Sequence, residues 1–254
     1  IMSHILWFSD CSYKKKNLVG GKCASLGELY NLSHELDFNI SDGFAITTKM
    51  YDDFLNNYNL HPIIENKLKE FNSIDNSTIK DLNDVSNFLM NLIMKYDLLD
   101  NHKKSIEEYY NELCKKYDYN IQVAVRSSAI AEDMPNASFA GQQDTYLNVV
   151  NINDLLLSVK KCFASLFNSR AISYRKSNLI SYNDVKISVG IQKMIRSDKG
   201  CAGVGFTLDP NNGYNKAIVI NGSWGLGEMV VSGKVTPDEF LSLIHISEPT
   251  RRYA

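Results

Sequence analysis

The sequence predicts an α+β fold, with a mainly helical lobe over residues 1–118 followed by a β-rich lobe over residues 119–240. Amphipathic patterns with the period of an α-helix recur between residues 48 and 116. Strand-like alternation of apolar and polar side chains occurs at residues 145–149 and again between 185 and 220. Glycine and Asn-Asn-Gly turns separate the later alternating segments, which is typical of an antiparallel meander.

Composition limits the possible function. The chain has 254 residues, of which 44% are hydrophobic, enough for one large domain or two lobes. A net charge of −2 gives no reason to expect nucleic acid or an anionic membrane as a partner. There is no signal-peptide pattern and no apolar run approaching the ~20 residues that span a bilayer. We expect a cytoplasmic protein.

The five cysteines are scattered, odd in number and contain no C-x-x-C pair. This pattern indicates neither a disulfide framework nor a zinc site, and it favours reduced thiols.

The helical region supplies a scaffold. Thr48 is predicted to cap a helix that runs through Leu55, and Pro62 suits the first turn of the next helix. Residues 79–96 and 103–116 form two further amphipathic segments. The histidines of this region do not gather into a ligand or triad pattern, so each is interpreted as a surface or packing residue.

The central stretch, residues 123–149, carries the strongest functional signal. A buried strand is predicted from Ile121 to Val125, and Arg126, Ser127 and Ser128 follow where it ends. A guanidinium in that position needs an anion, and hydroxyls add hydrogen-bonding groups. An alternative is that Arg126 pairs with an acidic residue of the following turn and only pins the loop.

A glycine-bearing loop continues the stretch. Gly141 allows close backbone approach to a ligand, and alternation resumes in residues 145–149 as a second strand. Arginine, hydroxyls and backbone N–H groups on one loop are the parts of a polyphosphate cradle.

A second candidate phosphate contact is the Gly20-Gly21-Lys22 turn. Ala24, Leu26 and Leu29 follow at helical spacing, so the turn leads into a helix N-terminus with an ammonium group beside it. The glycine spacing is not that of a P-loop, so the turn taken alone is better interpreted as an ordinary glycine turn with a surface lysine.

Beyond residue 149, Asn153 is predicted to cap an amphipathic helix, and Arg170 and Arg175 on its continuation are candidate structural ion-pair donors. The glycine-rich segment 222–228 resembles a dinucleotide motif only loosely, and we exclude that function.

These segments together resemble the N-terminal nucleotide-binding domain of the phosphoenolpyruvate synthase (pyruvate, water dikinase) family, which is related to pyruvate phosphate dikinase and the rifamycin phosphotransferases. The similarity extends from about Leu6 to Phe240. It rests on VGGKCASLGEL, VAVRSSAIAEDMPNASFAGQQDTYLNV, FASLFNSRAISYR, GIQKMIRSD and GSWGLGEMVVSGKVTPDEF.

The resemblance implies an ATP-grasp fold that binds ATP with Mg2+. By this resemblance Lys22 contacts the phosphates, Arg126 the transferred phosphoryl groups, Gly141 and Thr145 the phosphate loop, and Gln192 the nucleotide end of the cleft. In the family, ATP phosphorylates a histidine on a separate swivelling domain, and that histidine carries the phosphate to pyruvate in a C-terminal barrel. The implied partners are therefore ATP and these two domains of a longer protein, with no nucleic acid and no membrane.

Several departures qualify the resemblance. The family's metal ligands follow the point where this sequence ends, so we assign no metal ligand within it and expect the fragment to be inactive alone. Residues 241–254 look like a translated sequencing adapter and are expected to be poorly ordered or loosely attached.

Two alternatives to the synthase assignment stay open. The chain could be the ATP domain of a related dikinase or rifamycin phosphotransferase, or a stand-alone, non-catalytic nucleotide-binding module.

Overall fold

The computed structural model describes residues 3–117, 121–130, 133–134, 137–138 and 144–243. The chain forms two compact units, Ile1–Met194 and Ile195–Ala254. Of the described helices, none is long and apolar enough to cross a membrane.

An antiparallel sheet forms the centre of the first unit. Its strands lie in the order β1-β2-β7-β3-β6, and each pairs with its neighbours in antiparallel register. The strands are β1 (Ile5–Trp7), β2 (Gly43–Ile46), β3 (Val123–Ala129), β6 (Thr145–Val149) and β7 (Ile187–Lys193). A separate short hairpin joins β4 (Asp133–Met134) to β5 (Ala137–Ser138).

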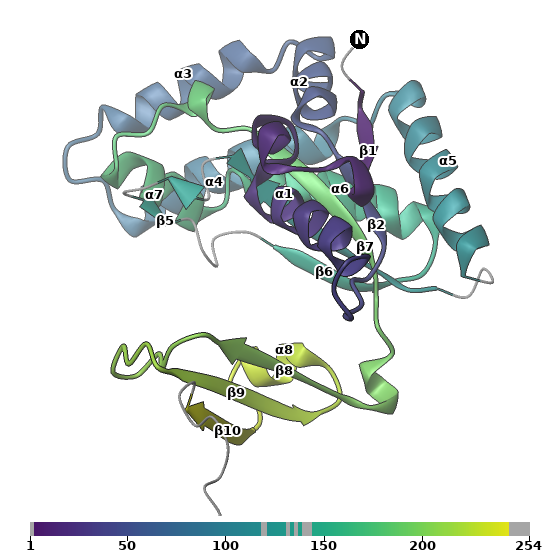
Figure 1. Ribbon diagram of the computed structural model, residues 1–254. Helices are drawn as coiled ribbons and strands as arrows, with labels where there is room; N and C mark the ends of the chain where they lie inside the picture. The colour runs from purple at the N-terminus through teal and green to yellow at the C-terminus, as the bar shows by residue number, and fades with distance from the viewer. Residues whose placement is uncertain (1–2, 118–120, 131–132, 135–136, 139–143, 244–254) are drawn as a thin grey trace, which may run out of the picture. The chain divides into compact units, whose positions relative to one another are not determined.

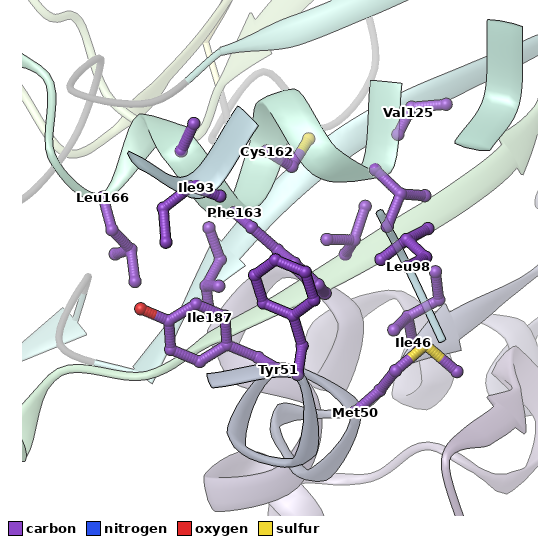
Figure 2. Packing of buried hydrophobic residues seen from close by; sticks show 14 of the residues in the cluster. Ile46, Met50, Tyr51, Ile93, Leu98, Val125, Cys162, Phe163, Leu166 and Ile187 are labelled. Atoms are coloured by element: carbon purple, nitrogen blue, oxygen red, sulfur yellow. The ribbon is translucent and has the colours of Figure 1, made fainter. Parts of the chain in front are cut away.

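Helices cover the sheet (Figure 1). Helix α1 (Lys16–Ser33) contacts β3 and β7 on one side, and α6 (Ile152–Ser165) contacts the same strands on the other. The main apolar core lies on the α6 side, where buried side chains such as Tyr51, Phe163 and Ile187 pack together (Figure 2). Burial of such large side chains contributes about 1.5–3 kcal/mol each to the free energy of folding.

The remaining helices of this unit are α2 (Thr48–Asn57), α3 (His61–Asn72), α4 (Ile79–Lys95), α5 (Asp100–Lys116) and α7 (Ser169–Ser177). Short 3-10 turns lie at Phe8–Asp10, Tyr13–Lys15 and Tyr182–Asp184.

The start of α4 is defined by a capping box, in which Thr78 accepts from the Asp81 backbone and Asp81 accepts from Thr78. Two predicted caps were wrong by a residue or two. Asn151, not Asn153, caps α6 by accepting from the Asp154 N–H. Thr48 does not cap α2, because its hydroxyl donates instead to the Asn17 carbonyl, 3.2 Å away.

The second unit is a small antiparallel sheet in the order β10-β9-β8, with α8 (Gly227–Val231) against β8. Its strands are β8 (Cys201–Phe206), β9 (Ala217–Trp224) and β10 (Asp238–Leu243), and a 3-10 turn at Ser197–Lys199 precedes β8.

Four sequence-based expectations differ from this arrangement. The predicted meander is divided, because β7 joins the central sheet whereas β8 and β9 form another. The segment 222–228 is not one loop, since its first residues complete β9 and Gly227 begins α8. The first tail residues, 241–243, extend β10 and pair with β9, so they are not loosely attached. The predicted strand at residues 121–125 is displaced toward the C-terminus and ends at Ala129.

The division into units also does not coincide with the expected lobe boundary at residue 118. Strand β2 from the first part of the chain pairs with β7, and β7 pairs with β3. Residues before and after 118 therefore share one sheet and one hydrophobic core.

Candidate functional site

Arg126 on β3 has a register partner on each of the two neighbouring strands. In the register of the sheet it stands opposite Thr145 on β6 and opposite Gly190 on β7. Side chains directly opposite each other on adjacent strands project from the same face. Arg126 and Thr145 are both exposed, so the guanidinium and the hydroxyl are accessible from one side of the sheet.

That side is the one that α1 covers. Val123, Val125 and Ala129 of β3 belong to the main core, so the alternate residues Arg126 and Ser128 point the other way. The Ser128 hydroxyl accepts a hydrogen bond from the Cys23 N–H of α1 at 3.3 Å, which identifies the face.

Gly20 interrupts α1 beside Ser128. Its φ of 70° and ψ of 169° are not helical, and a Cβ at this position would lie 2.2 Å from the Ser128 carbonyl oxygen. Both the backbone angles and the close approach require glycine. A new helical segment consequently begins at Gly21, with its first turn against β3.

Lys22 lies in that first turn. Its side chain is exposed, and its Nζ donates to the backbone carbonyl of Ser127 at 3.4 Å. Lys22 and Arg126 are thus on the same side of the sheet, beside a helix N-terminus. This is an arrangement of positive groups that suits phosphate oxygens.

Gln192 is on β7, two residues after Gly190 and on the same face by strand alternation. It is half-buried, and its Nε2 donates to the Ser41 carbonyl at 3.3 Å. Its register partners are Gly43 on β2 and Ala124 on β3, so it lies one pair of residues along the strands from Arg126.

The predicted residue Gly141 is outside the described part of the chain. The structure thus places Lys22, Arg126, Thr145 and Gln192 on one face of the sheet, and it leaves the position of Gly141 in the phosphate loop as a prediction.

The two serine hydroxyls have structural partners, contrary to their predicted role as ligand groups. Ser127 is 1% exposed and donates from Oγ to the Asp144 carbonyl at 3.3 Å, while Ser128 caps α1. Sequence reasoning missed these roles because the partners are 17 and 105 residues away.

Asp144 immediately precedes β6, and its carboxylate lies with the Tyr146 side chain on the core face of the sheet, away from Arg126 and Thr145. Its carboxylate accepts a hydrogen bond from the Tyr146 hydroxyl at 3.0 Å. Burial, followed by the nearby Asp144 charge, raises the pKa of Tyr146 well above its ordinary value, so Tyr146 stays protonated and holds this carboxylate.

The described residues do not assemble a set of magnesium ligands at this site. Mg2+ prefers several oxygen ligands in octahedral geometry, whereas the site residues are cationic apart from a hydroxyl and an amide. Within the described ranges, a group of three possible metal ligands occurs at His4, Asp53 and His102, and it contains two nitrogen donors. We therefore derive no step through magnesium from these residues.

Comparison with known proteins shows which family the chain belongs to. Residues 16–251 match the family described as "Pyruvate phosphate dikinase, AMP/ATP-binding domain". The chain is 44% identical over 238 residues to the phosphoenolpyruvate synthase of Aquifex aeolicus, a match that covers 93% of this chain and 28% of that relative.

Similar matches extend to other bacteria. The chain is 42% identical to the phosphoenolpyruvate synthase of Helicobacter pylori, covering 98% of this chain and 30% of the relative. It is 38% identical to that of Escherichia coli, covering 97% of this chain and 30% of the relative. The chain thus spans less than a third of the length of these curated relatives, and it belongs to the pyruvate phosphate dikinase AMP/ATP-binding domain family.

Proposed function

We propose that this chain is the ATP-binding part of a cytoplasmic phosphoenolpyruvate synthase and has an ATP-grasp fold. The observation that carries the proposal is the position of Lys22 and Arg126 on one side of the sheet, with Thr145 directly opposite Arg126. The family match and the relatives named phosphoenolpyruvate synthase support the same assignment.

The residue types suit the chemistry of phosphoryl transfer. This reaction needs positioning and neutralisation of charge more than covalent participation by the protein. Lys22 supplies a compact positive charge at a helix N-terminus, which we assign to the ATP phosphates. Arg126 supplies a planar fork that can hold two phosphate oxygens, which we assign to the transferred group.

The other predicted contacts complete the site. Thr145 and Gly141 belong to the proposed phosphate loop, through a hydroxyl and backbone N–H groups. Gln192 lies further along the same face, which suits a contact at the nucleotide end. Magnesium would shield phosphate charge when bound, and we propose that its ligands come from outside the residues described.

In the whole protein, the proposed reaction consumes ATP, pyruvate and water. One phosphoryl group passes from ATP to a histidine on another domain and then to pyruvate, a second is transferred to water and released as phosphate, and AMP is the remaining product. The domains that carry the histidine and bind pyruvate are proposed partners of this chain. The relatives' greater length leaves room for them.

Titration of the chain with ATP, followed by NMR, tests the nucleotide assignment. Replacing Lys22 by Ala removes one charge-assisted contact and should raise the Kd of ATP about tenfold. Lys104→Ala changes another exposed lysine, on α5, and serves as the control. An unchanged Kd in Lys22→Ala, or equal losses in both variants, would contradict the site.

A further inference from the structure

A cavity lies away from the proposed ATP site, lined by residues of α3, of α7 and of the segment that follows α7. Figure 1 shows where α3 and α7 lie in the first unit. We call it the α3–α7 cavity. Its volume is about 560 Å3, within the range of small-molecule sites. None of Lys22, Arg126, Thr145 or Gln192 lines it.

Arg175 is the most unusual residue in its wall. The side chain was expected to be an ion-pair donor, yet no carboxylate of the described residues pairs with it. It is only 5% exposed, and its NH2 group is buried without a hydrogen-bond partner among the described residues.

The side chains next to the Arg175 guanidinium are aromatic and uncharged. The guanidinium lies 5.8 Å from the centre of the Phe167 ring and near the tyrosine hydroxyls of residues 51 and 182. Burial lowers its pKa to about 10, so the group is still positively charged at neutral pH. A buried charge without an opposite charge is costly, and a bound anion would remove that cost.

Lys176 brings a second positive charge to the same wall. Its Nζ donates to the Ser77 hydroxyl at 3.0 Å and to the Phe71 carbonyl at 3.4 Å, and it lies 4.4 Å from the centre of the Phe71 ring. All of these partners are neutral, so the ammonium keeps its capacity to attract an anion.

The outer part of the cavity adds one further pair of charges. Lys69 lies 3.7 Å from Glu65, and both line the cavity. Glu65 is already engaged, because it also accepts a hydrogen bond from Asn183 at 3.1 Å. The charges of Lys69 and Glu65 cancel, so Arg175 and Lys176 give the cavity lining a net positive charge.

Apolar side chains complete the lining. Leu68 and Ile172 are buried, and Ile180 is half-buried. The volume is larger than a bare ion needs, so the cavity can hold an apolar group in addition to an acid group.

We propose that the α3–α7 cavity is a binding site for a small organic anion, a carboxylate or a phosphate monoester with an apolar portion, whose acid group is held by Arg175 and Lys176. This site is additional to the proposed ATP site and uses other residues.

Three simple probes test the required chemistry. Benzoate and phenyl phosphate carry an apolar ring and an anionic group, while benzamide is a neutral analogue of benzoate. Ligand-observed NMR titrations of the chain at low ionic strength should show a Kd for each anion at least tenfold lower than for benzamide. A lower Kd for phenyl phosphate than for benzoate would identify the natural ligand class as phosphate monoesters, and the reverse order as carboxylates.

Variants locate the binding. Lys176→Gln should raise the Kd of the preferred anion about tenfold, whereas Lys104→Gln on α5 should leave it unchanged. Arg175→Lys should weaken binding further, because the planar fork is lost. Arg175→Lys also alters a buried position, so its circular dichroism spectrum is compared with that of the wild type. If the two spectra differ, the proposal is tested with Lys176→Gln alone.

Three results would overturn the proposal. Binding of benzamide as tight as that of benzoate would show an apolar patch without anion recognition. An unchanged Kd in Lys176→Gln would remove the assigned acid contact. Weaker probe binding in Lys22→Ala would place the probes at the proposed ATP site. Failure of the wild-type chain to bind ATP, together with intact probe binding, would instead reject the ATP site and leave the α3–α7 cavity assigned.

Discussion

Ser128 on β3 accepts a hydrogen bond from the backbone N–H of Cys23 at 3.3 Å, across a sequence separation of 105 residues. A strand hydroxyl therefore does what an N-cap residue usually does for its own helix. The contact holds the first turn of the second segment of α1, which contains Lys22, against the strand that contains Arg126.

Replacing Ser128 by Ala should leave the buried Cys23 N–H without this acceptor. We expect the free energy of unfolding to fall by about 1–2 kcal/mol, measured by urea denaturation. Ser177→Ala at the exposed end of α7 is a matched control and should change stability little. Equal stabilities of Ser128→Ala and wild type would show that the hydrogen bond contributes nothing.

Gly20→Ala should be more damaging. A Cβ would lie 2.2 Å from the Ser128 carbonyl oxygen, and the positive φ of 70° is itself unfavourable for alanine. Backbone strain of this kind costs about 1–3 kcal/mol before the steric clash is added. We expect a clearly lower Tm in calorimetry and weaker ATP binding, because the helix N-terminus must move.

The control for this change is Gly200→Ala, where an added Cβ meets nothing within 4 Å and φ is −159°. A Tm for Gly20→Ala as high as that of Gly200→Ala would mean that the close approach to Ser128 is not required.

In the full-length phosphoenolpyruvate synthase that we propose, Arg126→Lys and Arg126→Ala should depress kcat far more than ATP affinity. This difference is expected if the guanidinium mainly stabilises charge that develops on the transferred group. Lysine offers a single point charge and should rescue little. The measurements are kcat, the Kd of ATP and Tm for both variants.

The opposing interpretation makes Arg126 a structural residue that pins the loop after β3. Unchanged kcat with a lower Tm in Arg126→Ala would move the residue from catalysis to scaffolding.

His102 should make the protein sensitive to acid. It is 0% exposed, neither ring nitrogen has a hydrogen-bond partner among the described residues, and its ring packs against His4 at 5.1 Å. Burial, and then the positive charges of His4 and Lys49, lower its pKa from 6.5 to about 4, while Asp53 opposes the shift.

The unfolded chain protonates His102 below about pH 6.5, whereas the folded protein does not do so until about pH 4. The stability contributed by this neutral histidine is therefore complete above pH 6.5 and is lost as the pH falls toward 4, by at most about 1.4 kcal/mol per pH unit. Urea denaturation from pH 7 to pH 4.5 should show a flatter dependence for His102→Phe than for wild type. His34→Gln changes an exposed histidine and should retain the wild-type slope.

Local patterns in the sequence predicted the α+β class and many elements. Alternation placed β6 at residues 145–149, and amphipathic spacing placed α4 within one residue of its observed end. These predictions succeed because the side-chain period of a strand or helix is a property of a few consecutive residues. The motifs around Lys22 and Arg126 predict phosphate contacts for these two residues, and that assignment stays a prediction.

Tertiary structure decided which elements pair and what each polar group does. The alternating pattern of residues 187–193 carries no information about its partners, yet β7 lies between β2 and β3 and is separated from β8 and β9. Ser128 was expected to bind a ligand, but it caps a helix from a distant part of the chain, and Arg175 was expected to form an ion pair, but it lines a cavity. The physical reason is that hydrogen bonds and charges are satisfied by neighbours in space, and buried groups take whichever partner the packing of the whole chain brings within reach.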